Sequence, residues 1–213
     1  MESNEIDQLL ISASETLANI LKQIHFEAIA YNGNLEMFLK GLFATALKKN
    51  DLSDDISWIA MDKQLSPPVA ESKRQSQEDM SIFLNSIQPP HHISIEFKST
   101  LSIDISKSKG QCVDALSKTN KHNIKNHRYI IHFHATYSHL ESGNTNSRDE
   151  FSNAPDIAKT CYNGLKSNFI TDELITYYKK ENSSIVLIST NPIPIYKIEN
   201  FKIDCCILRY HAA

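Results

Sequence analysis

Glu96 and Lys98 stand two residues apart in a short apolar run, HHISIEFKST, which covers residues 91–100. Side chains two apart in a strand point to the same face, so this carboxylate and this ammonium would lie side by side. Such a pair suits a hydrolytic reaction, in which a carboxylate holds a divalent cation and a lysine stabilises developing charge. It equally suits a salt bridge on an exposed strand face.

The same tripeptide pattern occurs a second time, at Glu71-Ser72-Lys73, so the pattern alone says little. The two pairs differ in their surroundings, because Glu96 and Lys98 lie in an apolar run whereas Glu71 and Lys73 lie in a polar stretch. Apolar strands seldom carry two charged positions unless the face is wet or functional. The sequence therefore favours a functional role for Glu96 and Lys98.

Asp79 begins the strand-like run DMSIFLNS that precedes this pair, and the turn IQPPH joins the two runs into a predicted hairpin. Counting outward from the turn places Asp79 opposite Ser99 or Thr100. This position is about three residues beyond Glu96, or ~10 Å along an ideal strand. A bulge or a splayed strand end would have to close this gap before the two acids act together.

Two kinds of apolar periodicity divide the rest of the chain into helices and strands. Helical spacing predicts helices over residues 6–24, 35–47, 110–123, 155–166 and 171–180. Strand-like runs cover 56–61, 69–73, 79–86, 92–105, 128–139, 183–190 and 195–210, the last as one long or two short strands. This order predicts an α/β fold with a central mixed β-sheet flanked by helices.

The length of 213 residues fits a single domain, residues 1–213, with an N-terminal helical segment. We expect residues 1–50 to form that segment, 51–140 to form a core that carries the candidate site, and 155–213 to add the C-terminal helices and strands. The Ser-, Asn- and Gly-rich stretch 141–154 has no apolar period, which predicts a mobile loop.

Composition excludes several classes of protein. With 22 Lys and Arg against 25 Asp and Glu, the chain lacks the basicity of a histone-like DNA coater, so nucleic-acid binding would need a local patch. The four cysteines have no Cys-x-x-Cys spacing, which indicates reduced thiols in a cytoplasmic protein rather than a zinc ribbon or thioredoxin motif. No stretch has the roughly 18 to 20 apolar residues of a membrane span, and the N-terminus lacks a signal-peptide pattern.

An acid at the start of one strand, a Glu-x-Lys in the next, then a helix and another strand resembles the PD-(D/E)xK nuclease superfamily, the fold of many restriction enzymes. The resemblance covers residues 34–140, and Glu78 stands where the family often has proline before its first acid. It implies a restriction-endonuclease-like core in a bacterial endodeoxyribonuclease, which hydrolyses phosphodiester bonds with Mg²⁺ or Mn²⁺.

The resemblance also implies roles for individual residues. Asp79, Glu96 and the carbonyl of Phe97 would be the metal ligands, and two carboxylates suffice because Mg²⁺ usually keeps several waters. Lys98 would orient the attacking water or stabilise the developing charge. The family's first helix often adds a carboxylate, for which Glu36 is the candidate. Two other N-terminal acids are alternatives, Glu15 and Glu27.

The helix after the Glu-x-Lys motif is the segment best suited to bind nucleic acid. From 107 to 128, Asp114 is the only acid, and the basic residues are Lys107, Lys109, Lys118, Lys121, Lys125 and Arg128. Lysines bind phosphates without reading sequence, although a solvated helix face explains them as well. The resemblance implies that Gln111 or Lys118 faces the active site. We expect double-stranded DNA as partner, and a homodimer that cuts both strands.

Two alternatives stay open. His132 and His134 share a strand face and are spaced to chelate zinc, but no third ligand follows at a family spacing. A catalytically inactive nuclease-fold module that binds nucleic acid or a protein partner would have the same fold, because fold alone does not determine function.

Overall fold

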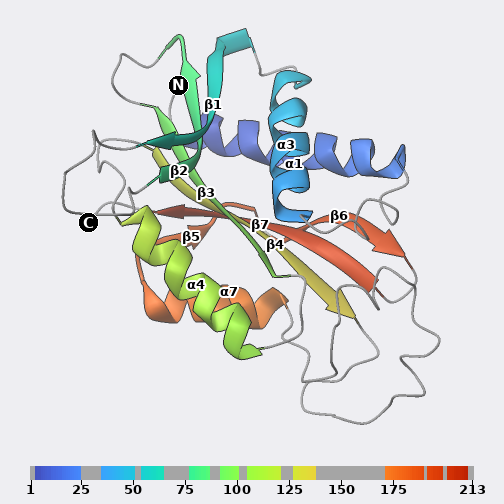
Figure 1. Cartoon of the computed structure of the whole chain (residues 1–213), viewed down its shortest axis with the longest axis vertical. Coiled ribbons are helices and arrows are strands. Elements are labelled where there is room, and N and C mark those ends of the chain that lie inside the picture. The colour runs from blue at the N-terminus through green and yellow to red at the C-terminus, as the bar shows by residue number, and fades with distance from the viewer. Residues whose placement is uncertain are drawn as a thin grey trace.

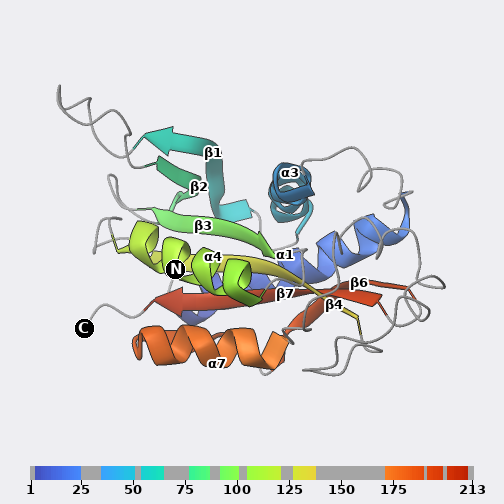
Figure 2. The ribbon, with the colours of Figure 1, turned by 60° about the horizontal axis from the view of Figure 1, so that its bottom comes forward.

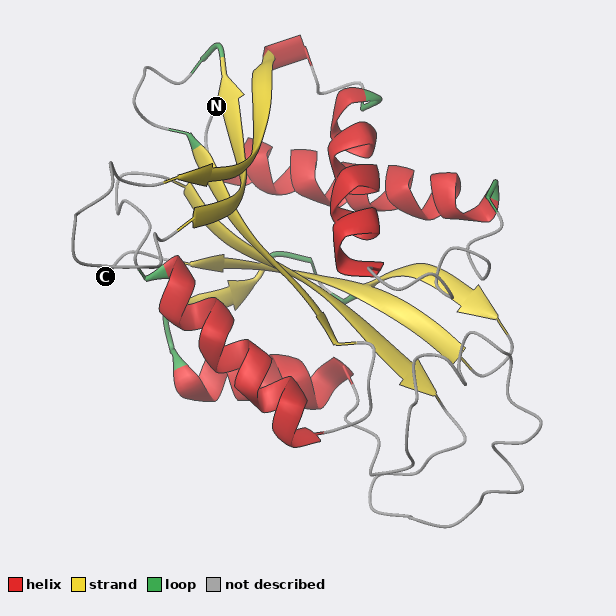
Figure 3. Ribbon diagram, in the orientation of Figure 1, coloured by secondary structure: helices red, strands yellow, loops and turns green. Residues whose placement is uncertain are grey.

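The computed structural model describes residues 3–24, 35–50, 54–64, 77–86, 92–100, 105–120, 127–137, 171–189, 191–198 and 201–210. Their elements, in chain order, are α1 (Ser3–Lys22), α3 (Leu35–Lys48), β1 (Ile56–Gln64), β2 (Gln77–Leu84), β3 (Ile93–Thr100), α4 (Ile105–Thr119), β4 (His127–Tyr137), α7 (Thr171–Glu181), β5 (Ile185–Leu187), β6 (Ile193–Ile198) and β7 (Phe201–Tyr210). The protein has an α/β fold in which helices flank a mixed sheet, which confirms the predicted class (Figures 1 and 3).

The described strands form one sheet in the order β1-β2-β3-β4-β7-β5, and β6 also pairs with β7. The first three strands make an antiparallel meander, whereas β3 and β4 run parallel. A parallel pair needs a crossover connection, which α4 supplies. β7 is antiparallel to β4, and β5 and β6 share its other edge. β3 therefore lies inside the sheet, between β2 and β4.

Helices α1 and α3 cover one face of the sheet, and α4 and α7 lie side by side on the other (Figures 1 and 2). The first face carries the larger apolar core, to which β3 contributes Ile95 and Phe97. Because side chains alternate along a strand, Glu96 and Lys98 point to the face that α4 covers. The candidate pair thus lies beneath a helix.

Most expected elements are confirmed, and two boundaries are wrong. The strand expected over 92–105 ends at Thr100, and the helix expected from Gly110 begins at Ile105. Ile105 lies two residues after Ile103 and seven before Cys112, so it fits both a strand and a helix period and periodicity cannot assign it. The C-terminal segment forms two strands, and β5 has 3 residues. The expectations for 69–73, 141–154 and 155–166 fall outside the described residues.

Cys112, Cys205 and Cys206 are free and buried. Burial raises the pKa of the Cys112 and Cys205 thiols to about 12, and that of Cys206 well above its usual value. These thiols therefore stay protonated and unreactive at neutral pH. Cys161 lies outside the described residues. Among the described helices, none is long and apolar enough to cross a membrane.

Candidate active site

Asp79 lies closer to the Glu-x-Lys pair than the turn count predicted. The last β2–β3 pair at this end is Met80 with Ile95, so the next residue, Asp79, is level with Glu96. The backbone N–H of Phe97 donates a hydrogen bond of 2.8 Å to Asp79 Oδ2. The end of β2, where its pairing with β3 stops, thereby brings its carboxylate to the Glu-x-Lys segment of β3, and the observed register closes the gap for which the sequence required a bulge or a splayed strand end.

The expected position opposite Ser99 or Thr100 is wrong because the assumed turn centre is wrong. The expected register places the midpoint of the hairpin at the proline pair of the turn IQPPH. The observed pairing of Ile82 with Ile93 is centred earlier in the sequence, which moves the whole register. A proline pair indicates that a turn is present but does not fix where its centre lies.

Glu96 is fully buried, and its negative charge is incompletely compensated. The Nζ atoms of Lys98 and Lys118 form ion pairs at 2.9 and 3.1 Å, both with Glu96 Oε1. Oε2 receives no hydrogen bond from any described residue. Burial, followed by the negative charge of Asp79, raises the pKa of Glu96 to about 7 despite both lysines. Such a carboxyl has a buried oxygen without a hydrogen-bond donor among the described residues, which a bound cation would satisfy.

Lys98 links Glu96 to the helix above it. Its Nζ also lies 2.8 Å from Asp114 Oδ2 of α4, and Lys118 Nζ lies 3.6 Å from the same oxygen. Burial lowers the pKa of Lys98, but the two carboxylates outweigh burial and hold it above its usual value. Lys98 is therefore charged at neutral pH. With 0 and 7% of their surfaces exposed, Glu96 and Lys98 do not form a salt bridge on an exposed strand face.

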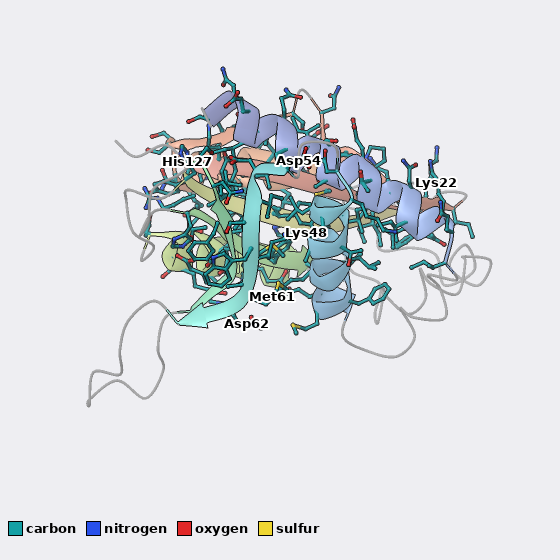
Figure 4. All side chains as sticks on the ribbon, turned by 90° about the horizontal axis from the view of Figure 1, so that it is seen from above. Lys22, Lys48, Asp54, Met61, Asp62 and His127 are labelled. Carbon is teal, nitrogen blue, oxygen red and sulfur yellow. The ribbon has the colours of Figure 1, made fainter. Side chains whose placement is uncertain are left out.

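Lys40 of α3 forms an ion pair with the carboxylate oxygen of Asp79 that Phe97 does not contact. The sequence did not predict this contact. Lys40 Nζ lies 3.5 Å from Asp79 Oδ1 and 2.6 Å from Asp62 Oδ1 of β1, although only 3% of Lys40 is exposed. Asp62 has a φ of 52°, in the left-handed region that few non-glycine residues adopt. Figure 4 shows Asp62 at the end of β1 remote from Asp54. The available signal was spacing, because Lys40 follows Glu36 by one helical turn.

Glu36, the carboxylate expected from the first family helix, reaches β3 but is held by Ser99. Its Oε2 accepts hydrogen bonds from the Ser99 backbone N–H at 3.0 Å and from Ser99 Oγ at 3.2 Å. The structure therefore brings it to the residue that follows Lys98. Of the two alternatives, Glu15 is exposed on α1 and Glu27 lies outside the described residues.

Among the residues expected to bind nucleic acid, Lys118 is the one that the structure places against Glu96. Gln111 is half-buried and lies one turn before Asp114 on the same face of α4. Lys109 Nζ instead lies 5.5 Å from the ring centroid of Tyr177 on α7. The side chain of Lys107, and the whole of Lys121 and Lys125, are outside the described part.

Arg128 does not belong to the exposed basic patch that was expected. Only 4% of its surface is exposed, and its guanidinium lies 4.2 Å from the ring centroid of Tyr210. One guanidinium nitrogen also donates a hydrogen bond of 3.4 Å to the Thr119 carbonyl. Arg128 therefore ties the end of α4 to the sheet, which leaves it little surface for a phosphate.

The histidine pair is buried on the face that carries Glu96. His132 Nδ1 lies 2.8 Å from the Tyr178 hydroxyl, and the two histidine ring centroids are 6.1 Å apart. Burial, with His134 and Lys98 nearby, lowers the pKa of His132 well below its usual value, so its ring is neutral. Within the described ranges, no group of three or more His, Cys, Asp or Glu side chains is placed to hold a metal ion. The described residues thus offer no third ligand for zinc.

The oxygen donors at Asp79 and Glu96 nevertheless suit a hard divalent cation, because Mg²⁺ needs only one or two carboxylates beside its waters. In a strand the N–H and C=O of one residue point to the same neighbour, so the Phe97 carbonyl is on the side of Asp79. Around this position, negative charges outnumber positive charges by two when every group is ionised. Five carboxylates face three ammonium groups: Glu36, Asp62, Asp79, Glu96 and Asp114 against Lys40, Lys98 and Lys118.

Comparisons with known proteins give no relative for this chain. No family model matches it, and neither a curated protein nor a solved structure matches it at a significant level. The function must therefore be argued from the geometry of the site.

Proposed function

We propose that this protein is a magnesium-dependent nuclease of the PD-(D/E)xK type that hydrolyses phosphodiester bonds in DNA. The position of Asp79 carries the proposal, because this acid is level with Glu96 and accepts a hydrogen bond from Phe97. The order of elements supports it as well. A helix, a three-stranded meander, a crossover helix and a parallel strand follow one another, as the resemblance to restriction enzymes implies.

Asp79, Glu96 and the carbonyl of Phe97 would hold the Mg²⁺ or Mn²⁺ ion. When bound, the ion neutralises phosphodiester charge and lowers the pKa of the attacking water. Lys98, which is charged at neutral pH, would stabilise the negative charge that develops on the phosphate. Glu96 must lose its proton to bind a cation, so activity should increase as the pH rises through about 7.

The lysines on Glu96 favour a second candidate function. Lys98 and Lys118 both lie within 3.1 Å of Oε1, and the described residues contain no three-ligand group. Ammonium groups that neutralise the acid would suit a catalytically inactive nuclease-fold module, which binds nucleic acid or a protein partner without cutting. The lack of a hydrogen-bond donor at Oε2 and the raised pKa of Glu96 favour the active form.

Incubation with supercoiled plasmid tests the choice between these two functions. The nuclease predicts cleavage in Mg²⁺ that EDTA stops and excess Mg²⁺ restores. An absence of cleavage of plasmid, linear duplex and single-stranded DNA in both Mg²⁺ and Mn²⁺ would leave the inactive module as the function.

We also propose that the active unit is a two-fold homodimer on double-stranded DNA, because two one-site subunits are needed to cut both strands in one encounter. Light scattering should show a dimer at micromolar protein concentration. A monomer both with and without DNA contradicts this assembly.

A further inference from the structure

Three aromatic rings form a row across the β1–β2–β3 meander. Trp58 of β1 pairs in register with Phe83 of β2, and their rings stack with centroids 4.0 Å apart and planes 4° from parallel. Phe83 also stacks on His92, at 4.9 Å and 27°. The row ends at Trp58, because β1 is an edge strand of the described sheet.

Trp58 leaves one side of its ring open. With 51% of its surface exposed, it is the most exposed of the large apolar residues in the described part of the chain. Since its ring is nearly parallel to that of Phe83, one face is covered and the exposed surface comprises the opposite face and the edge. A flat aromatic face backed by a second ring is suited to stack another planar π-system.

The His92 end of the row is buried and fixed. His92 Nε2 lies 2.6 Å from Glu78 Oε2, and the Ser81 hydroxyl donates to the same oxygen. These contacts hold the imidazole in place against Phe83. The buried end of the row is thus fixed before any ligand arrives, which reduces the entropy lost on binding.

The row and the candidate active site occupy the same face of the sheet. His92 directly precedes β3 and lies four residues before Glu96, and in extended chain this even number puts both on one side, about 13 Å apart. Lys118, whose side chain is 39% exposed, adds a positive charge above Glu96. The β1–β2 hairpin extends beyond α4 (Figure 2), and 51% of the surface of Trp58 is exposed.

We propose that Trp58, backed by Phe83, is a stacking platform for an unpaired nucleobase of the DNA that enters the active site. The inference rests on the proposed function, because one strand would reach both the platform and Glu96. Bases inside a duplex already stack on one another, so the platform would take a base that has left the duplex, at an overhanging end or by flipping out of the stack. Stacking of this kind changes affinity by about five- to a hundredfold per base.

A protein partner fits this surface less well. A standard protein interface buries about 800 Å² on each partner, whereas the described residues at the platform offer one exposed indole. Met61, the other exposed large apolar residue described on β1, lies an odd number of residues from Trp58 and so faces the opposite side of the sheet. The surface suits a single flat ligand.

Intrinsic fluorescence provides a direct test, because the chain contains 1 tryptophan, Trp58. With EDTA present to prevent cleavage, a short oligothymidylate should quench its emission in a saturable way. A blunt duplex of equal length should cause little quenching at the same concentration. No quenching by the oligothymidylate, or equal quenching by the duplex, overturns the platform.

Substitutions provide the second test, with binding of a fluorescein-labelled oligothymidylate measured by anisotropy in EDTA. Trp58→Ala should weaken binding about tenfold, and Trp58→Phe about two- to threefold. Val186→Ala is the matched control, since Val186 is an exposed apolar residue on β5, and it should bind as the wild type does. Binding by folded Trp58→Ala within about twofold of the wild type overturns the proposal.

These measurements separate the platform from the catalytic proposal. Plasmid cleavage without quenching would refute the platform and leave the nuclease intact. Saturable quenching of the wild type, together with weaker oligothymidylate binding by Trp58→Ala in the anisotropy assay, in a protein that cuts no DNA, would support the platform and refute the nuclease.

Discussion

Asp7 and Glu96 are two buried acids on opposite faces of the same sheet, and they differ in how well hydrogen-bond donors and positive charges compensate their carboxylates. Asp7 of α1 accepts hydrogen bonds from the Tyr129 hydroxyl at 2.8 Å and from Arg209 at 2.5 Å, one on each carboxylate oxygen. At Glu96, two lysines approach a single oxygen, and the other has no donor among the described residues.

The difference separates a structural acid from a candidate functional one. Asp7 joins α1 to β4 and β7, and its loss would leave polar partners unpaired in the core. Burial, with the hydrogen bond to Asp7 adding to it, raises the pKa of Tyr129 and keeps its hydroxyl a donor. The fold gains nothing comparable from Glu96, whose pKa burial and Asp79 raise to about 7. A costly buried charge of this kind is typical of sites that bind or react.

The largest expected difference between the two regions is in catalysis. Lys98→Ala should lower the rate of plasmid cleavage by about 10²- to 10³-fold, because it removes a fixed charge from the transition state. Magnesium affinity should hold or increase, since a positive charge beside Glu96 is lost. Single-turnover cleavage and calorimetric titration with Mg²⁺ measure the two effects. Asp7→Asn is the control and should cut at the wild-type rate, whereas a fully active Lys98→Ala would remove Lys98 from the chemistry.

The second-largest difference between the two acids should be in how each makes the free energy of unfolding depend on pH. The pKa of Glu96 is raised from 4.5 to about 7 in the folded state. Between these two pKa values the folded chain binds more protons than the unfolded chain. The stability that Glu96 contributes in its protonated form is therefore fully present below pH 4.5 and is lost as the pH rises through about 7. A shift of this size corresponds to about 3 kcal/mol. Urea unfolding in EDTA at several pH values should show this loss in the wild type and in Asp7→Asn.

The matched variant for that measurement is Glu96→Gln, which has no proton to lose at this position. Its free energy of unfolding should be nearly flat over the same pH window. A curve as steep as that of the wild type would show that another group carries the dependence.

A smaller effect is expected on stability at fixed pH. Asp7→Asn should lower the free energy of unfolding by about 2–3 kcal/mol at pH 8, because the largely buried Arg209 loses its charged partner. Glu96→Gln should lower it by less, since the ionised acid is poorly compensated at that pH. Equal losses in urea unfolding would mean that the fold depends on both acids alike.

The smallest expected effect is at the second Glu-x-Lys. The double variant Glu71→Gln with Lys73→Ala should change stability by under about 0.5 kcal/mol and leave cleavage unchanged, as exposed substitutions do. These residues lie outside the described part, so the expectation rests on the polar sequence around them. A large loss of cleavage would show that sequence environment does not distinguish the two motifs.

Sequence patterns predicted which strands carry the site but not how they align. Glu96 and Lys98 stood out as charges in an apolar run, and Asp79 as the acid before the preceding strand. Which residues of the two strands lie opposite one another depends on the register of the hairpin, and the composition of the turn does not determine that register. Register is set by the packing of the whole meander on its core face, and that information is spread over several strands.

Lys40 was missed for a different reason. It lies next to the apolar stripe of a helix, between Leu39 and Phe43. A single lysine at such a position gives no sign in the sequence that it pairs with acids elsewhere. Its partners Asp62 and Asp79 come from two other elements, far along the sequence. The three-dimensional fold alone brings them together, as it brings Lys118 to Glu96.

Plasmid cleavage by Glu96→Gln in Mg²⁺ is the most direct test of the proposed site. Glutamine keeps the shape of the side chain and loses the negative charge, so Mg²⁺ should bind more weakly and cleavage should largely vanish. Circular dichroism should show that the variant is folded, and Asp7→Asn should cut in the same assay. Full cleavage by Glu96→Gln would contradict the assignment of this site.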